Sequence, residues 1–286
     1  MTIPARVRER VVAGLKKFVP VIQQARQRDV SEADTVTIVK DILSEVMGYD
    51  KYAELTSEHS IRGTYCDLAV KVNGALQMLI EVKSAGTNLD DRHVKQAVDY
   101  AANQGCDWVI LTNGTTWRLY QVLFGKPIDK RLLTEIDLTT LELRKEASIE
   151  QAWLLTKEGF LKGAHVELRD RKDATSRFTL AALMTHNEAL AGAIRRELRR
   201  VVDVLIDEES ILTVLRDEVI KRDCLEGPEA EAAARRVNRL EGKSLRAAKA
   251  GTESDPARSR SAAKSQAEAV PLPTRTSTPA ATTPRA

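Results

Sequence analysis

Two charged residues lie inside an otherwise apolar stretch, Met78-Leu-Ile-Glu-Val-Lys83. Glu81 and Lys83 are two positions apart, so in an extended strand their side chains share one face. As a bare buried ion pair they would return little net stability. At the rim of a sheet, a carboxylate beside an ammonium can instead bind a divalent cation and position a water. The pair therefore indicates metal-assisted hydrolysis.

A second carboxylate, Asp67, lies in the preceding extended run, and its distance from Glu81 depends on the register of the hairpin. A two-residue turn, Asn73-Gly74, would place Asp67 opposite Ile80, on the wrong face. A three-residue loop at positions 73–75 produces the pairs Val72–Leu76, Val70–Met78, Leu68–Ile80 and Asp67–Glu81. We expect the longer loop because it matches apolar residues three times, and a one-residue slip turns every side chain to the opposite face. Opposed Cβ atoms lie roughly 4.5–5.5 Å apart, so both carboxylates can share one cation.

Two further polar residues, Gln96 and Tyr100, follow on a predicted helix. They are four positions apart and are expected to share a helix face. Together, Asp67, the Glu81-Val82-Lys83 run and Gln96-x-x-x-Tyr100 resemble the PD-(D/E)XK nuclease pattern with its QxxxY extension. The resemblance is to the variant found in the N-terminal nuclease domain of type I restriction enzyme R subunits.

The resemblance extends over about residues 29–125, under half of the chain. It includes the runs Ser31-Glu-Ala-Asp-Thr35, Gly48-Tyr49-Asp50 and Trp108-Val-Ile-Leu-Thr-Asn-Gly-Thr-Thr-Trp117. One position departs from the pattern, because Cys66 precedes Asp67 where the family's name has proline.

The resemblance implies a role for each residue of the core motif. Asp67 and Glu81 would hold Mg²⁺, for which Mn²⁺ would substitute, together with the backbone carbonyl of Val82. Lys83 would orient or help deprotonate the attacking water, or offset the charge that develops on the scissile phosphate.

Supporting roles are implied for three further residues. Gln96 and Tyr100 would support the site or bind the DNA backbone. Glu32 matches the acid that the family carries on its first helix, although Asp34 and Glu45 are nearby candidates for that role.

The elements that must position these residues form an α/β pattern. Runs rich in β-branched and aromatic residues predict strands at Glu54–Ile61, Tyr65–Val72, Leu76–Lys83, Trp108–Thr112 and Thr116–Leu123. One helix, about Asp90–Gln104, separates the third run from the fourth. The sequence thus predicts a restriction-endonuclease-like mixed β-sheet flanked by helices. Within it, Trp108, Trp117 and Tyr120 are interpreted as packing residues rather than as base-stacking platforms.

Two helices are predicted before the first strand. The first thirty residues form a basic amphipathic helix with apolar Val7, Val11, Leu15 and Phe18, which Pro20 is expected to bend or end. The second helix runs from about Glu32 to Met47, with Ser31 as N-cap and Gly48 at its end. Basic residues on the first helix, and the later ridge Arg195, Arg196, Arg199 and Arg200, could bind phosphates. We favour solvated amphipathic faces as their explanation.

The sequence predicts five segments. They are a basic N-terminal helix at 1–28, the nuclease-like domain at 29–147, a helical domain at 148–227, a charged helix or linker at 228–250, and a disordered tail at 251–286. Pro228 is expected to end the folded part, because the charged segment after it has no convincing apolar stripe.

Composition narrows the class of protein. The 286 residues include 44 basic and 41 acidic side chains, a net of only +3, so a nucleic-acid partner must be met by local basic patches. No stretch is apolar enough for a membrane span or a secretory signal, which indicates a cytoplasmic protein without a membrane partner. Gly242-Lys243-Ser244 resembles the end of a Walker A loop but lacks the strand-turn-helix context, so no ATP site is expected.

Together these features predict a Mg²⁺-dependent deoxyribonuclease, a restriction-type endonuclease of a defence system or mobile element without its own ATP-driven motor. The expected partners are DNA and, through the helical region, a separate motor, specificity or other protein subunit. One alternative is a catalytically idle DNA-binding or partner-docking module on the same fold, although the intact Asp67, Glu81 and Lys83 argue against it. Another is a helical adaptor with an incidental α/β core.

Overall fold

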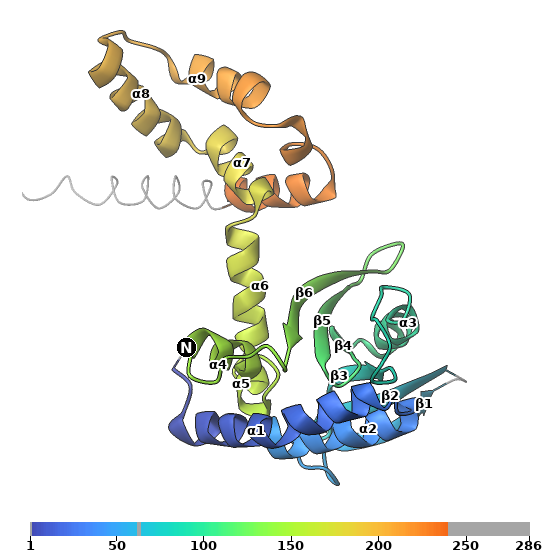
Figure 1. The fold of residues 1–286 in the computed structure, drawn as a ribbon. Helices are drawn as coiled ribbons and strands as arrows, with labels where there is room; N and C mark the ends of the chain where they lie inside the picture. Colours follow the sequence, from blue (N-terminus) through green and yellow to red (C-terminus); the bar gives the residue numbers. More distant parts are fainter. Residues whose placement is uncertain (1, 62–63, 240–286) are drawn as a thin grey trace, which may run out of the picture. The chain divides into compact units, whose positions relative to one another are not determined.

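The computed structural model of the chain describes residues 2–61 and 64–239 (Figure 1). It divides into two compact units, Met1–Ser176 and Arg177–Ala286. The first unit holds a mixed sheet flanked by helices, and the described part of the second is helical, which confirms the predicted fold class. The predicted tail at 251–286 and the Gly242-Lys243-Ser244 run lie outside the described residues. No helix in the described part of the chain combines the length and apolarity that crossing a membrane requires.

Six strands form one sheet in the order β1-β2-β3-β4-β5-β6. Their bounds are Leu55–Ile61, Thr64–Val72, Ala75–Val82, Trp108–Thr112, Thr116–Leu123 and Asp129–Asp137. Neighbouring strands are antiparallel except for β3 and β4, which are parallel and joined through helix α3, Lys95–Gln104. The five predicted strands and the crossover are therefore confirmed. Trp117 and Tyr120 are buried in this sheet, as predicted.

The sixth strand, β6, was missed because its burial pattern is interrupted. Leu119 pairs with Thr134 and Tyr120 pairs with Leu132, so Leu133 is the extra residue of a β-bulge. The bulge places buried Leu133 and Ile136 three positions apart rather than two. Alternation with a period of two, the sequence signal for a half-buried strand, is consequently lost.

The β2–β3 hairpin corrects the predicted loop. Asn73 and Gly74 form a two-residue turn, both with positive φ, and Val72 pairs with Ala75. A bulge at Gln77 then shifts the register, so that the pairs Val70–Met78 and Leu68–Ile80 form as predicted. The predicted three-residue loop was wrong, but the bulge restores the pairing on which the position of Asp67 depends.

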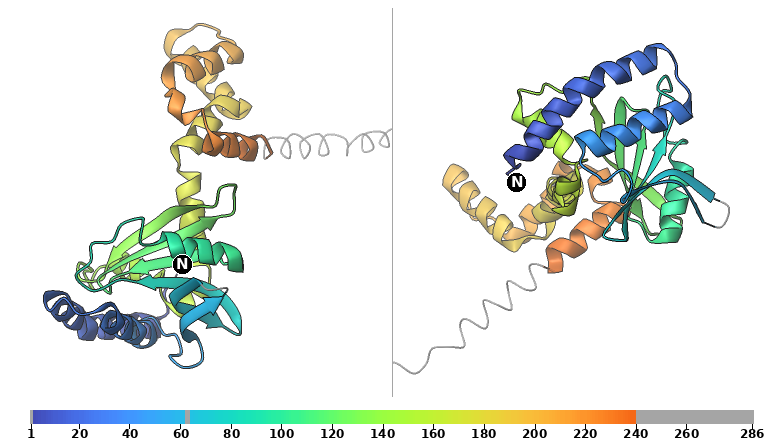
Figure 2. Two further views of the ribbon diagram at one scale, coloured as in Figure 1. Left: turned by 90° about the vertical axis from the view of Figure 1, so that its right-hand side faces the viewer. Right: turned by 90° about the horizontal axis from the view of Figure 1, so that it is seen from below.

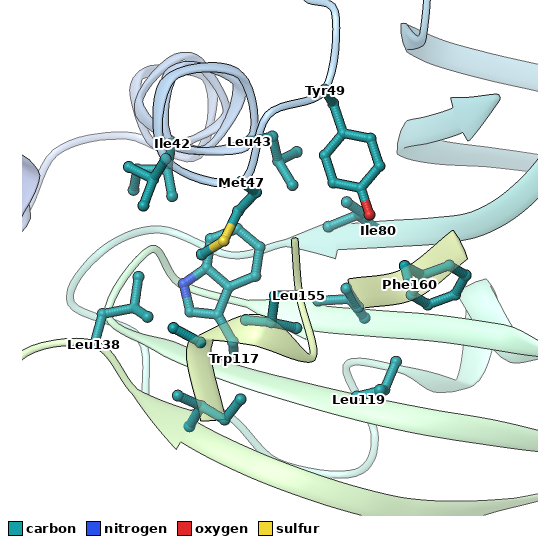
Figure 3. Close-up of a cluster of buried hydrophobic side chains, with 14 of the residues drawn as sticks. Ile42, Leu43, Met47, Tyr49, Ile80, Trp117, Leu119, Leu138, Leu155 and Phe160 are labelled. Carbon is teal, nitrogen blue, oxygen red and sulfur yellow. The ribbon is translucent and has the colours of Figure 1, made fainter. Parts of the chain in front are cut away.

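Helices cover both faces of the sheet (Figures 1 and 2). On one face lie α1, Ala5–Gln27, and α2, Glu32–Asp41, which continues into a π-helical turn, η1, Ile42–Val46. Figure 3 shows the core on this side, where side chains such as Met47, Trp117 and Leu138 meet. Helix α3 covers the other face, with Val98 and Tyr100 buried against the sheet.

Helix α1 runs through Pro20, so of the two predicted outcomes, a bend or an end of the helix, the end does not occur. Pro20 is exposed, whereas Phe18 and Ile22 on either side of it are buried in the core. The ring therefore lies on the solvent side, where water can hydrogen-bond to the backbone carbonyl that loses its partner. Packing of the buried face of α1 against the core outweighs the tendency of proline to end a helix.

Three short helices after the sheet belong to the first unit: α4, Glu146–Trp153, α5, Lys157–Leu161, and α6, Ala164–Ala174. Trp153 and Phe160 are part of the same core as α1. The unit therefore includes the N-terminal helix and ends at Ser176, whereas the sequence indicated boundaries near residues 28 and 147.

Several basic residues of α1 have structural partners. Arg8 pairs with Glu146 of α4, and Lys17 pairs with Glu45. Arg10 donates to both carboxylate oxygens of Glu158, at 2.7 and 2.6 Å, and to the carbonyls of Val46 and Met47. This guanidinium thus joins α1, the end of η1 and α5.

The second unit is built from short helices around a small core. They are α7, Arg177–His186, α8, Glu188–Val202, α9, Glu208–Val214, the π-helical turn η2, Leu215–Val219, and the 3₁₀ turn η3, Arg222–Cys224. A helical segment at 228–239 follows, so Pro228 does not end the folded part as predicted. Ala233 and Val237 of this segment pack with Ala182 of α7. The apolar stripe of this segment is short and consists partly of alanine, so the sequence pattern did not predict that the segment packs.

The arginine ridge on α8 is exposed and partly paired within the unit. Arg195 lies 3.5 Å from Glu208, and Arg200 lies 2.7 Å from Glu197. Of the helix itself, only Ala191 is fully buried. These contacts agree with the favoured interpretation of a solvated amphipathic face.

Because His165 of α6 is buried, we expect the first unit to lose stability in acid. Its ring stacks on Phe160 at 3.8 Å and meets Trp108 edge-on at 4.5 Å, and the residue is 4% exposed. Burial, assisted by the charge of Arg169, lowers the pKa of His165 to about 4. Below its ordinary pKa of 6.5 the unfolded chain takes up a proton that the folded unit rejects. Stability is therefore lost as pH falls from about 6.5 to about 4.

We expect this histidine to cost the unit about 3 kcal/mol of stability between pH 7 and pH 4. The free energy of urea unfolding, measured against pH for the wild type and for His165→Phe, isolates this contribution because other groups titrate in both proteins. The difference between the two proteins should shift by that amount in favour of the variant. Parallel curves would show that His165 titrates normally.

Candidate functional site

The end of β3 carries the two charged residues that the sequence singles out. Because β3 lies inside the sheet between β2 and β4, Glu81 is only 7% exposed. By strand alternation it shares the face of Leu79, which packs under α3. The Lys83 Nζ lies 2.8 Å from the Glu81 Oε1, and the backbone N–H of Lys83 donates to the carbonyl of Thr112 in β4. The sheet thus holds the pair at its rim.

Asp67 reaches the same position from β2. Its Oδ2 accepts a hydrogen bond from the backbone N–H of Val82 at 2.7 Å. The ladder pairs of β2 and β3 run as far as Leu68 and Ile80, and beyond them this side-chain contact ties Asp67 to β3. In a strand the N–H and C=O of one residue point to the same side. The Val82 carbonyl therefore also faces the β2 side, where Asp67 lies.

Burial and mutual repulsion set the charge state of the carboxylates. Desolvation raises the pKa of Glu81 to about 7; the charges of Asp67 and Glu32 add to this effect, and the hydrogen bond from Lys83 opposes it. Desolvation works against the charge of Lys83, but the hydrogen bond to Glu81 and the charges of Glu81, Glu32 and Asp67 together raise the Lys83 pKa. The site thus has an excess of negative potential that one ammonium only partly offsets.

Glu32 joins this group from α2. Ser31 caps the helix as predicted by accepting from the Asp34 N–H, which places Glu32 in the first turn. The Glu32 carboxylate lies 3.3 Å from the Lys83 Nζ. Of the other two candidate acids, Asp34 accepts from the Ser31 hydroxyl and Glu45 pairs with Lys17. Of these three acids, Glu32 is therefore the one that contacts the site in the described part of the chain.

Gln96 and Tyr100 differ in their surroundings, although they are four positions apart on α3. Gln96 is exposed in the first turn of the helix. Tyr100 is 1% exposed and packs in the cluster between α3 and the sheet, which also contains Cys66. The structure thus places Tyr100 beneath the helix rather than beside Gln96 on an open face.

Cys66, which replaces the proline of the motif, has a structural environment. It is 1% exposed, and its Sγ lies 3.2 Å from the carbonyl oxygen of Ile80, to which the thiol donates. Burial, with help from the charge of Glu81, raises the pKa of the thiol to about 12. Cys66 is therefore a neutral packing residue next to Asp67.

Sequence reasoning missed the residues that hold the loop after Lys83. The Asn113 side chain donates to the carbonyl of Thr87 at 2.9 Å, and the Ser84 and Thr87 hydroxyls are 2.7 Å apart. Asn113 also accepts from the backbone N–H groups of Thr115 and Thr116. The Asn113-Gly114 pair signalled only a turn, and nothing local indicated that it would anchor a loop over twenty residues earlier.

The groups that could bind a cation are the carboxylates of Asp67 and Glu81 and the carbonyl of Val82, which do not make up a complete coordination shell. Within residues 2–61 and 64–239, no three His, Cys, Asp or Glu side chains form a cluster that could hold a metal ion. Lys83 instead lies between Glu81 and Glu32. The charge of Asp67 nevertheless raises the pKa of Glu81, and oxygen donors of this kind suit a hard divalent cation.

The first unit thus places two carboxylates and a lysine together at the rim of a mixed α/β sheet. Residues 38–134 match the family described as type I restriction enzyme R protein N terminus (HSDR_N). The matched segment is about a third of the chain and contains Asp67, Glu81, Lys83, Gln96 and Tyr100. This confirms the predicted resemblance to the N-terminal part of type I restriction enzyme R proteins. No curated protein and no solved structure matches the chain.

Proposed function

We propose that the first unit is a metal-dependent deoxyribonuclease that hydrolyses DNA phosphodiester bonds. The observation that carries this proposal is the convergence of Asp67, Glu81 and Lys83 at the rim of the sheet, within the segment that matches a restriction enzyme family. A structural ion pair would need neither the second carboxylate nor the burial that penalises Glu81.

Asp67, Glu81 and the Val82 carbonyl are the groups that would hold Mg²⁺, or Mn²⁺ in its place. When bound, the cation would activate water and polarise the scissile phosphate. Two negative charges in a half-buried site are compatible with this role, because a divalent cation would offset the repulsion between them.

Lys83 is assigned the role of a fixed positive charge. Its raised pKa keeps the ammonium protonated near neutral pH, so it can donate to the attacking water or stabilise charge on the phosphate but is poorly suited to act as a base. Glu32 orients Lys83 from α2, and Tyr100 maintains the packing of α3 on the sheet. Gln96, which is exposed on α3, is assigned a contact with the DNA backbone.

The family named by the match supports a proposal about partners. A restriction enzyme R protein acts with DNA and other subunits, and we propose that this chain uses its second, helical unit to bind a separate motor or specificity subunit. We further propose that it functions in a defence or mobile-element system in the cytoplasm as an endonuclease without an ATP site of its own.

Metal-dependent nicking tests the proposal directly. Purified protein is incubated with supercoiled plasmid and with single-stranded DNA in Mg²⁺, Mn²⁺ or EDTA. We expect open-circular or linear products with either metal and none in EDTA. Products that persist in EDTA would contradict the proposed chemistry.

A catalytically idle DNA-binding or docking module is the second candidate. The contact of Lys83 with both Glu81 and Glu32 favours it, because this ammonium already neutralises part of the donor set. Calorimetric titration of Mg²⁺ separates the candidates when a folded wild type does not cleave. A heat of Mg²⁺ binding that is lost in Asp67→Asn would indicate an intact site that requires a partner or a modified substrate. Salt-dependent DNA binding without Mg²⁺ binding would indicate the idle module.

A further inference from the structure

Two arginines lie at the connection between α1 and α2. Arg26 is in the last turn of α1, Arg28 is the C-cap residue of that helix, and both are exposed. Four residues after Arg28, α2 begins with Glu32, which contacts Lys83. The connection is therefore a neighbour of the candidate site along the chain.

The connection is held in one conformation. The N–H groups of Arg28, Asp29 and Val30 donate to the carbonyls of Gln24, Arg26 and Ala25 at 3.0, 3.2 and 3.2 Å. Asp29 has a positive φ of 47°, which ends α1, and Ser31 caps α2. A rigid connection of this kind positions the two arginines with little conformational freedom in their backbone.

The same connection packs against the loop that follows Lys83. The Asp29 carboxylate approaches Gly86 so closely that a Cβ at position 86 would overlap it. Gly86 is three residues beyond Lys83. The arginines are consequently tied to the catalytic rim at two points, through Asp29 to Gly86 and through Glu32 to Lys83.

The acids next to these arginines contact other groups, and the Asp29 carboxylate faces Gly86. Glu32 is engaged by Lys83 and Asp34 by the Ser31 hydroxyl. Elsewhere on α1, Arg8, Arg10 and Lys17 have carboxylate partners. In the part of the chain that the structure describes, no ion pair includes Arg26 or Arg28.

We infer that Arg26 and Arg28 bind phosphates of the nucleic-acid strand that enters the candidate site, an inference that rests on the proposed nuclease function. A guanidinium presents paired N–H donors that match the oxygens of a phosphodiester. Phosphate contacts position a strand without reading its sequence. The two side chains thus form a sequence-independent clamp beside the rim.

The test compares two double variants of the full chain. Arg26→Gln/Arg28→Gln removes the clamp, and Arg6→Gln/Lys16→Gln removes two exposed charges from the same helix further from the site. Binding to a fluorescein-labelled 30-base-pair duplex and to the corresponding single strand is measured in EDTA by anisotropy over a range of salt concentrations. EDTA keeps the probe uncleaved and makes the readout independent of catalysis.

We expect the clamp variant to bind about tenfold more weakly, with the slope of log K against log salt reduced by about 1.8, and the control to change less than about twofold. Arg26→Lys/Arg28→Lys should keep the wild-type slope of log K against log salt. If the double variant is poorly folded, the single variant Arg28→Gln provides the same measurement of DNA affinity. Equal losses in both double variants, an unchanged clamp variant, or a wild type that binds neither probe would overturn the inference. A clamp effect in a protein that neither cleaves DNA nor binds Mg²⁺ would reject the proposed nuclease and leave the clamp standing.

Discussion

Lys83→Ala should lower metal-dependent DNA cleavage about 10³-fold while the protein stays folded. Lys83 is the only described cation within ion-pair distance of Glu81, so its loss removes the group that would stabilise charge on the phosphate. Folding should survive, because Glu81 already has a pKa of about 7 and can take up a proton when its partner is removed. Initial rates of plasmid nicking, with thermal unfolding measured in parallel, check both parts.

Lys157→Ala is a matched control for this variant. Lys157 pairs with Glu54, and their side chains are 29% and 12% exposed, close to the 18% and 9% of Lys83 and Glu81. Removal of a similar ion pair should affect stability in a comparable way but leave cleavage near the wild-type rate. If both variants lost activity equally, the effect of Lys83 would be structural.

Asp67→Asn separates the metal from the lysine. The amide keeps an oxygen that can accept from the Val82 N–H, so the β2–β3 contact is preserved while the negative charge is lost. The variant should bind Mg²⁺ far more weakly and cleave at background rate, whereas Lys83→Ala should keep metal binding. Isothermal titration with Mg²⁺ distinguishes these results, and identical calorimetric behaviour of the two variants would contradict the assigned roles.

Arg10→Ala should destabilise the first unit by about 3 kcal/mol, which corresponds to a fall in Tm of about 10 °C. The change leaves the Glu158 carboxylate without its two charged hydrogen bonds and removes a donor from the carbonyls of Val46 and Met47. It also opens space above Gly48, over which the guanidinium lies. Arg10→Lys should recover little of the lost stability, because an ammonium cannot reproduce the paired hydrogen bonds of the planar guanidinium to the Glu158 carboxylate.

Differential scanning calorimetry of the full chain measures this effect. Arg6→Ala, an exposed arginine on the same helix, should change the stability by no more than about 0.5 kcal/mol. In the double variant Arg10→Ala/Glu158→Ala, the two losses should be less than additive, because they break one interaction. Strict additivity would indicate that the two side chains do not depend on each other.

The sheet and the central motif could be predicted because their signals are local. Apolar runs and turn residues identified five strands, and the matching of apolar residues across β2 and β3 brought Asp67 towards Glu81. The turn was nevertheless wrong, since a bulge at Gln77 changes the register partway along the hairpin. A bulge arises from how the strand twists against its neighbours, and no residue type predicts where it will form.

Prediction from local signals failed where distant parts of the chain meet. Pro20 was expected to bend or end α1, but burial of Phe18 and Ile22 against the core keeps the helix continuous. The helical segment after Pro228 was not expected to pack, because its buried residues are mostly alanines with little apolar surface of their own. In both cases the deciding free energy comes from contacts with other elements.

By itself, the sequence determined which residues could do chemistry and on which face of which strand they lie, because side-chain direction follows from the backbone repeat alone. Only the tertiary structure decided that Glu32 contacts Lys83 while Asp34 and Glu45 have other partners. It also decided that Arg10 braces the core while Arg26 and Arg28 remain exposed beside the site. These outcomes depend on how helices pack across fifty or more residues of chain, and no local periodicity encodes that packing.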